Sequence, residues 1–341
     1  MNALATLIAD RIRDTGPIGL DDFMAAATRH YYASRDPFGA RGDFITAPEI
    51  SQMFGELIGA WCADTWRQMG APARFILAEL GPGRGTLLAD ALRAVPSLAS
   101  AELHLVEGSP ALRAMQAEKL ARYAPRWHER VEDLPGGPMI LIANEFLDAL
   151  PIRQFERAAA GWRERRVGLG GSGFAFTLAP TTESLPEAPL GAIREICPAA
   201  RELAAWLAAR LQRDGGAALF VDYGYVAGGF GDTLQSLRAH RRHDVLDDPG
   251  EADITGHVDF TAFARAATGA NIFGPVEQGA FLHRLGIAER AERLMRSASP
   301  EQARQIASAR RRLVDPGAMG SLFKVMALAN PALPLPAGFE G

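Results

Sequence analysis

The sequence has few cysteines, no long hydrophobic run and no excess of basic residues. Only Cys62 and Cys197 occur among 341 residues, so a disulfide framework or a thiolate zinc site is not expected and a reducing compartment fits. No apolar stretch approaches the roughly 18–20 residues of a membrane-spanning helix. With 36 Lys and Arg against 40 Asp and Glu, the mildly acidic balance argues against a nucleic-acid partner. HExxH and CxxC patterns are absent, so no metal is expected.

The amino-terminal residues form an amphipathic pattern that carries both acidic and basic side chains. This pattern is typical of an ordinary helix and differs from a signal or transit peptide. We therefore expect a cytoplasmic protein without a membrane span. Its oligomeric state does not follow from the sequence.

A glycine-rich turn organises the chain. A strand-like apolar run at 75–80 leads into Gly81, Gly83 and Gly85, and a helical pattern follows at 85–94. Strand, glycine turn and helix present backbone N–H groups and a helix N-terminus to a ligand. Glycine permits close approach and positive φ angles. A structural turn without any ligand is the alternative interpretation.

Two residues beside this turn favour one class of ligand. Thr86 stands where the dinucleotide fingerprint requires glycine or alanine. Glu79 ends the strand, and its carboxylate would repel a pyrophosphate but suit an ammonium group. S-adenosylmethionine (SAM) has an ammonium and a sulfonium and carries no phosphate. The turn therefore predicts SAM as the cofactor, with Glu79 and the three glycines as its contacts.

The chain before and after the turn divides into segments. Residues 1–70 read as a helical cover, with helices at 3–14, 20–30 and about 47–69 and an irregular, aromatic stretch at 31–44. Thr46 and Glu49 form a capping-box pattern at the start of the third helix. From 71 to 330, strands and helices alternate, which predicts a doubly wound parallel sheet. Three insertions interrupt this alternation: a β-meander (about 152–180), an aperiodic loop (225–258) and helices (281–315). A proline-rich tail follows at 331–341.

Several motifs together resemble one known family, the MidA-like SAM-dependent methyltransferases. The matching stretches are 42–56, 79–86, 143–151, 221–224 and 253–260, and the resemblance covers about residues 4–328. It departs from the family pattern at Gly108 and Leu147. The resemblance implies a class I SAM-dependent methyltransferase, with a Rossmann-like seven-stranded sheet whose last strand is antiparallel. The family includes a mitochondrial complex I assembly factor that methylates a protein arginine.

Further cofactor contacts are expected at the ends of the second and third predicted strands. Glu107 lies 24 residues after Gly83, where an acid accepts hydrogen bonds from both ribose hydroxyls. Trp127 and Asp133 follow the third strand, where class I enzymes usually hold the adenine. A tryptophan that is simply part of the core is an equal alternative.

The candidate catalytic residues are Glu145, Asn144 and Glu56. Asn144 and Glu145 end the fourth predicted strand, beside the expected position of the reactive methyl group. A guanidinium nucleophile needs a carboxylate to clamp it and turn one nitrogen toward the methyl. Glu145 is the best-placed acid for that role. Glu56 and Glu49 are expected on one face of a roof helix, with Glu49 also explained as the capping-box acid.

Candidate substrate contacts lie at Glu49, in the motif at 221–224 and around the 225–258 loop. They are Asp222, Tyr223, His240, His257 and Asp259. For the histidines and Asp259, a structural role is an equal alternative.

Together these features predict a SAM-dependent methyltransferase. The resemblance implies that it methylates an arginine of a protein partner, a respiratory complex I subunit or its bacterial equivalent. A small-molecule methyltransferase and a non-catalytic assembly factor on a SAM-binding fold are the alternatives.

Overall fold

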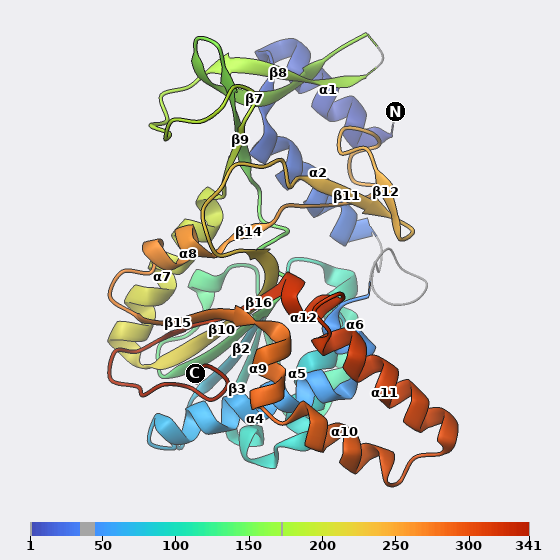
Figure 1. Ribbon diagram of the computed structural model, residues 1–341, viewed down its shortest axis with the longest axis vertical. Helices are drawn as coiled ribbons and strands as arrows, with labels where there is room; N and C mark the ends of the chain where they lie inside the picture. The colour runs from blue at the N-terminus through green and yellow to red at the C-terminus, as the bar shows by residue number, and fades with distance from the viewer. Residues whose placement is uncertain (1, 35–44, 172, 341) are drawn as a thin grey trace.

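A mixed central sheet positions all other elements. The computed structural model describes residues 2–34, 45–171 and 173–340 (Figure 1). Seven strands lie in the order β15-β16-β10-β5-β2-β3-β4, and β14 pairs with β10 beside this path. The strands are β2 (Ile76–Leu80), β3 (Glu102–Val106), β4 (Arg126–His128), β5 (Met139–Asn144), β10 (Gly216–Tyr225), β14 (Val258–Asp259), β15 (Asn271–Glu277) and β16 (Phe323–Ala329). β16 runs antiparallel to both neighbours, whereas β10, β5, β2, β3 and β4 are parallel. The predicted doubly wound sheet with an antiparallel last strand is confirmed.

Helices cover both faces of this sheet because its strands are apolar on both sides. In β5, Ile140 and Ile142 join one buried cluster, whereas Met139, Leu141 and Ala143 join the other. The first cluster includes α4 (Gln52–Gln68), α5 (Thr86–Ala94), α9 (Gln278–Arg284) and α10 (Ile287–Met295). The second includes α7 (Pro198–Asp214) and α8 (Phe260–Ala266). Apart from two helices described below, the other helices are α3 (Ala47–Ile50), α6 (Pro110–Leu120), α11 (Pro300–Val314), α12 (Met319–Leu322) and the short 3-10 segments Pro96–Ser100, Ala121–Tyr123 and Val131–Asp133.

A second lobe, here called the upper lobe, sits above the carboxyl ends of the parallel strands (Figure 1). It contains α1 (Ala3–Thr15) and α2 (Leu20–Ser34). Its larger sheet is built from β1 (Ile18–Gly19), β6 (Arg153–Ala158), β7 (Gly161–Leu169), β8 (Phe174–Pro180) and β9 (Ile193–Ile196). Its smaller sheet is built from β11 (Gln235–Arg238), β12 (Arg241–His243) and β13 (Asp253–Thr255). The two helices share an apolar cluster with residues of both sheets.

The amino-terminal 70 residues do not act as one cover. α1 and α2 pack in the upper lobe, whereas α4 packs in the core of the central sheet. Tyr31 and Tyr32 belong to α2, and the predicted irregular residues 35–44 lie outside the described part of the chain. The 225–258 segment, predicted as an aperiodic loop, contains β11, β12 and β13.

The predicted long helix from residue 47 is broken at Ser51. Ser51 adopts an extended conformation, and its side chain accepts a hydrogen bond from the Met53 N–H, so it caps α4. Thr46 precedes α3 without a side-chain capping bond, so the predicted capping box does not form. Across residues 2–34, 45–171 and 173–340, no helix is long and apolar enough to cross a membrane.

Candidate cofactor and substrate site

A cavity of about 1070 Å³ lies where the carboxyl ends of the parallel strands face the upper lobe. Ligands of doubly wound proteins bind at this edge of the sheet. Among the described lining residues there are seven carboxylates and three arginines: Glu49, Glu79, Glu107, Glu129, Glu145, Asp148 and Asp253 against Arg29, Arg84 and Arg130. This balance favours ligands that carry positive charge.

The glycine turn forms one wall of the cavity. Gly81 and Gly83 line it with φ angles of 59° and 52°, a region in which other residues are strained. Gly85 also has a positive φ, 73°, but it does not line the cavity. Gly85 caps α5, and a side chain there would press on Leu120 and Gln116. Its predicted role as a cofactor contact is therefore corrected to a structural one.

Glu79 provides a buried carboxylate at the same wall. Its side chain is 3% exposed, and Oε2 has no hydrogen-bond partner among the described residues. Burial raises the pKa of this carboxyl to about 8. A carboxylate left without a partner in a cavity fits a cationic ligand, because a nearby positive charge stabilises its ionised form. The ammonium group of SAM has this property.

Glu107 follows β3 and fits the predicted role toward a ribose. Its Oε1 accepts the Ser109 N–H at 2.8 Å, and its Oε2 accepts from Gln116 Nε2 at 3.3 Å. Burial raises its pKa, although these two hydrogen bonds act in the opposite direction. Each carboxylate oxygen retains further acceptor capacity for hydroxyl groups. Together, Glu79, the glycine turn and Glu107 match the amino-acid end and the ribose of SAM.

Trp127 and Asp133 do not line the cavity. Trp127 pairs with Leu105 in the ladder between β3 and β4, packs against the buried cluster on that side, and donates to Gln116 Oε1 at 2.8 Å. Asp133 accepts the Arg130 N–H at 3.2 Å within a 3-10 turn. The geometry gives neither residue the predicted contact with the cofactor. Glu129 and Arg130 line the cavity from this segment instead.

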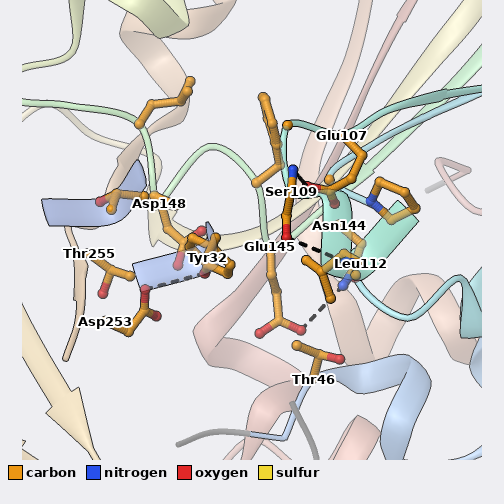
Figure 2. A pocket seen from close by; sticks show the side chains of 18 of the residues that line it. Tyr32, Thr46, Glu107, Ser109, Leu112, Asn144, Glu145, Asp148, Asp253 and Thr255 are labelled. Atoms are coloured by element: carbon orange, nitrogen blue, oxygen red, sulfur yellow. Dashed lines mark hydrogen bonds between the residues drawn. The ribbon is translucent and has the colours of Figure 1, made fainter. Parts of the chain in front are cut away.

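Asn144 and Glu145 lie together at the end of β5 and line the cavity (Figure 2). Glu145 has a φ of 51° and is held by a hydrogen bond from its N–H to the Val221 carbonyl at 2.8 Å. A left-handed conformation at a residue with a side chain stores strain, which is concentrated at functional sites. The Asn144 Oδ1 is buried and has no hydrogen-bond partner among the described residues.

The carboxylate of Glu145 faces the cavity and touches α3. Its Oε1 accepts the Ala47 N–H at 3.1 Å and the Asn144 amide at 3.3 Å. Burial raises the pKa of Glu145 to about 8, and the nearby charge of Asp148 adds to this effect. A cation that binds beside it would restore the ionised form.

Asp222 was predicted to contact substrate, but it does not line the cavity. Its Oδ2 accepts the backbone N–H groups of Phe146, Leu147 and Asp148 at 3.1, 2.8 and 3.2 Å. This fixes the turn that carries Glu145 and Asp148, so Asp222 is a positioning residue.

The other candidate substrate contacts divide into two groups. Tyr223 and His257 line the cavity, with their rings edge to face at 5.4 Å. His240 and Asp259 do not line it. His240 lies between β11 and β12 with a φ of 60°. Asp259 caps α8 and pairs with Arg194 at 2.9 Å. Asp259 is therefore a structural residue, and His240 is an exposed turn residue outside the cavity.

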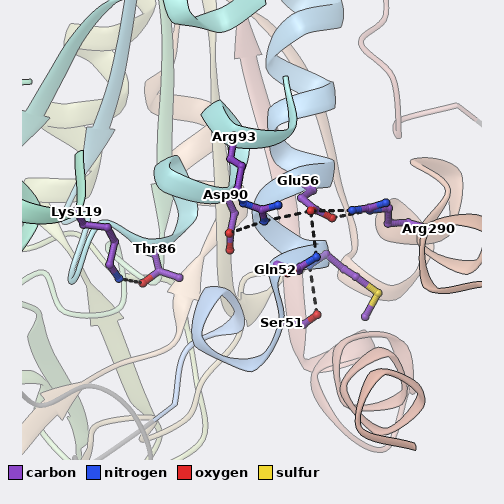
Figure 3. Close-up of polar contacts among 9 residues, drawn as sticks. Ser51, Gln52, Glu56, Thr86, Asp90, Arg93, Lys119 and Arg290 are labelled. Atoms are coloured by element: carbon purple, nitrogen blue, oxygen red, sulfur yellow. Dashed lines mark hydrogen bonds and ion pairs between the residues drawn. The ribbon is translucent and has the colours of Figure 1, made fainter. Parts of the chain in front are cut away.

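Glu49 and Glu56 lie on different helices, because the chain is broken at Ser51. Glu49 lines the cavity, and its carboxylate accepts from Thr86 Oγ1 and lies 3.5 Å from Arg84. Glu56 lies outside the cavity. It binds Arg290 at 2.6 and 2.9 Å and Arg93 at 3.2 Å (Figure 3). Its predicted catalytic role is corrected: it joins α4 to α5 and α10.

The upper lobe also contributes to the cavity, which the sequence patterns did not predict. Tyr32 from α2 and Asp253 and Thr255 from β13 line it beside Asp148 (Figure 2). Tyr32 donates to Asp253 Oδ1 at 3.2 Å across 221 residues of sequence. The signal for Asp253 was its place at the start of the 253–260 motif.

Comparisons with known proteins agree with this geometry. Residues 57–276 match a family described as "Putative S-adenosyl-L-methionine-dependent methyltransferase". The "Protein arginine methyltransferase NDUFAF7 homolog, mitochondrial" of Drosophila melanogaster is 37% identical, over 96% of this chain and 84% of its own. The "Protein arginine methyltransferase NDUFAF7, mitochondrial" of Danio rerio is also 37% identical, over 95% of this chain and 86% of its own.

A solved structure is similar over nearly the whole chain. A protein from Burkholderia thailandensis, crystallised with S-adenosyl-homocysteine bound, has a TM-score of 0.84 and 29% sequence identity. The match covers 98% of this chain and 94% of that one. The upper lobe and the central sheet therefore recur together in a protein that binds the demethylated form of SAM.

Proposed function

The chain belongs to this family of SAM-dependent methyltransferases, and from that premise we propose that it methylates an arginine side chain of a protein partner. The family gives the cofactor, SAM. The relatives named above are protein arginine methyltransferases in mitochondria. The resemblance noted in the sequence extends the proposal to a subunit of respiratory complex I or its bacterial equivalent. A cytoplasmic location for this chain stays a prediction.

The observation that carries the arginine proposal is the surplus of hydrogen-bond acceptors at the end of β5. Glu145 offers a carboxylate, and Asn144 offers a buried oxygen that has no partner in the described residues. A guanidinium carries five N–H donors and no acceptor. A site that presents acceptors to the cavity therefore suits arginine better than a hydroxyl or a carboxylate.

The residues at the end of β5 would bind and orient this group. When bound, SAM supplies an electrophilic methyl group and leaves as S-adenosyl-homocysteine. Glu145 would hold the guanidinium by charge-assisted hydrogen bonds and direct one nitrogen toward the methyl group. As the new N–C bond forms and the C–S bond breaks, the attacking nitrogen loses one proton. The Glu145 carboxylate, ionised beside the bound guanidinium, would accept that proton.

A paired-peptide assay tests the proposal. The purified protein is incubated with SAM carrying a deuterated methyl group and with two peptides that differ at one position, arginine or lysine. We expect the heavy methyl group on the arginine peptide, located by fragmentation mass spectrometry, and none on the lysine peptide. Transfer to lysine alone, or to neither peptide while a small-molecule fraction of a lysate becomes labelled, would contradict the arginine assignment.

A further inference from the structure

The cavity contains a second group of polar side chains, on the side of Glu145 away from Glu107. Figure 2 shows Asp148, Asp253, Tyr32 and Thr255 gathered there, apart from Glu107 and Asn144. We call these four residues the Asp148 subsite. All four line the cavity. Asp148 comes from the turn after β5, whereas the other three come from the upper lobe.

Asp148 carries the argument because its carboxylate is incompletely paired. Asp148 is only 6% exposed, and its Oδ1 has no hydrogen-bond partner among the described residues. Burial raises the pKa of this carboxyl to about 6, although the Tyr223 hydroxyl and the backbone N–H groups of Ala149 and Asp148 act in the opposite direction. A buried carboxylate oxygen without a partner is costly. Such a group at the wall of a cavity fits a ligand that supplies a donor.

A second carboxylate increases the negative charge of this subsite. Asp253 is 7% exposed and accepts from the Tyr32 hydroxyl at 3.2 Å. One guanidinium held at Glu145 would neutralise that carboxylate and leave the charge of Asp148.

We propose that the Asp148 subsite binds a second nitrogen cation of the substrate protein, close to the arginine that is methylated. The ligand is a lysine, arginine or histidine side chain near the target in the partner's structure. This inference rests on the proposed arginine methylation and adds a rule of substrate choice to it. Glu145 would select the reacting group, and Asp148 with Asp253 would select its neighbourhood.

A peptide series tests the rule. Each peptide has one target arginine among neutral residues. In each member of the series, one Lys, Arg or His replaces one glutamine, at one of the four positions on either side of the target. Steady-state methylation gives KM and kcat, and fluorescence anisotropy with S-adenosyl-homocysteine present gives the dissociation constant. We expect a cation at one or more of these positions to lower KM and the dissociation constant by roughly 10- to 100-fold relative to the neutral peptide. This is the range for a hydrogen bond to a charged group.

Variants then locate the effect. Asp148→Asn and Asp253→Asn should bring the ratio of KM between the neutral and the best cation-bearing peptide close to one. Asp247→Asn, an exposed aspartate in the same lobe, makes the same change of charge outside the cavity and should preserve the ratio. Melting temperatures identify any variant that fails to fold, and Thr255→Val offers a milder change in the same subsite.

The outcomes separate this inference from the proposed function. Arginine methylation without dependence on neighbouring cations would overturn the inference and leave the proposed function standing. Binding that depends on a neighbouring cation but without methylation would support the subsite and contradict arginine transfer. Equal losses for Asp148→Asn on neutral and cation-bearing peptides would overturn the inference, because they would place Asp148 at the reacting guanidinium.

Discussion

Replacing Glu145 with glutamine removes one charge at the centre of the proposed chemistry. The amide keeps the size of the side chain but cannot offer two anionic oxygens to a guanidinium or accept the proton that methylation releases. Loss of one preorganised electrostatic contact costs about 10²–10³ in turnover in other enzymes. We expect a loss of that size in kcat. SAM affinity should change little, because Glu79 and Glu107 make the expected cofactor contacts.

The pH dependence gives an independent test of the same residue. Glu145 has a pKa raised to about 8 by burial, so most of the enzyme without substrate carries a protonated Glu145 at neutral pH. With SAM saturating, kcat/KM for an arginine peptide should therefore rise as pH increases and level off at or below about pH 8, because the sulfonium of bound SAM also favours the ionised carboxylate. The kcat profile should level off at lower pH, because a bound guanidinium favours the ionised carboxylate.

The assay is single-turnover and steady-state methyl transfer from pH 6 to 9, with calorimetry for SAM. Glu145→Gln should lose the rise of kcat/KM with pH as well as its rate. Glu118→Gln, an exposed glutamate on α6, is the matched control and should behave as wild type. Near-normal turnover in Glu145→Gln, or an unchanged pH profile, would refute the assignment of the substrate to the end of β5.

Five other variants test the structure. Gly83→Val should lower SAM affinity by more than about 100-fold in calorimetry, because Gly83 has a φ of 52° at the cavity wall. The control Gly231→Ala should bind SAM normally, because a side chain at residue 231 meets nothing within 4 Å. Glu107→Gln should weaken SAM by about 10- to 150-fold, since an amide loses the charge-assisted bonds to the ribose; an unchanged dissociation constant would make Glu107 a structural acid. Arg290→Ala should lower the free energy of unfolding by about 1–3 kcal/mol, measured by urea denaturation, and leave SAM affinity unchanged, because Glu56 lies outside the cavity. Glu79 and Glu145 have folded pKa values of about 8 against an ordinary value of 4.5, so the cofactor-free protein binds more protons when folded than when unfolded. Its stability should therefore fall as pH rises from about 4.5 to 8. Glu79→Gln should reduce this dependence of the melting temperature on pH in thermal melts.

The central sheet and its cofactor wall follow from local sequence. Parallel strands place their carboxyl ends at one edge, so Glu79, Glu107 and Glu145 had to converge once β2, β3 and β5 were recognised. The same reasoning gives the glycine turn, because Gly81 and Gly83 stand directly between β2 and α5.

The sequence-based site predictions were wrong where the direction of a side chain depends on its neighbours in the fold. Trp127 pairs with Leu105 and packs against the core. The pattern of a three-residue strand is too short to show which way its side chains point. Glu56 was placed beside Glu49 on one helix, but the extended backbone of Ser51 separates them. Asp222 lies beside the cavity edge, yet its carboxylate is used by the backbone of the 146–148 turn.

The upper lobe's role could not be read from local patterns. Tyr32 and Asp253 meet across 221 residues, and no periodicity in either segment indicates the partner. Their contact depends on how α2 packs against β13, which is a property of the whole fold. The Asp148 subsite therefore emerged only from the structure.

The most direct test of the central claim is to identify the methylated product. A lysate from cells that lack this protein is incubated with the purified enzyme and SAM carrying a heavy methyl group, and peptides are analysed by mass spectrometry. We expect a heavy methyl group on an arginine of a protein, present with wild type and lost with Glu145→Gln. Label confined to small molecules or to residues other than arginine, with wild type active, would contradict it.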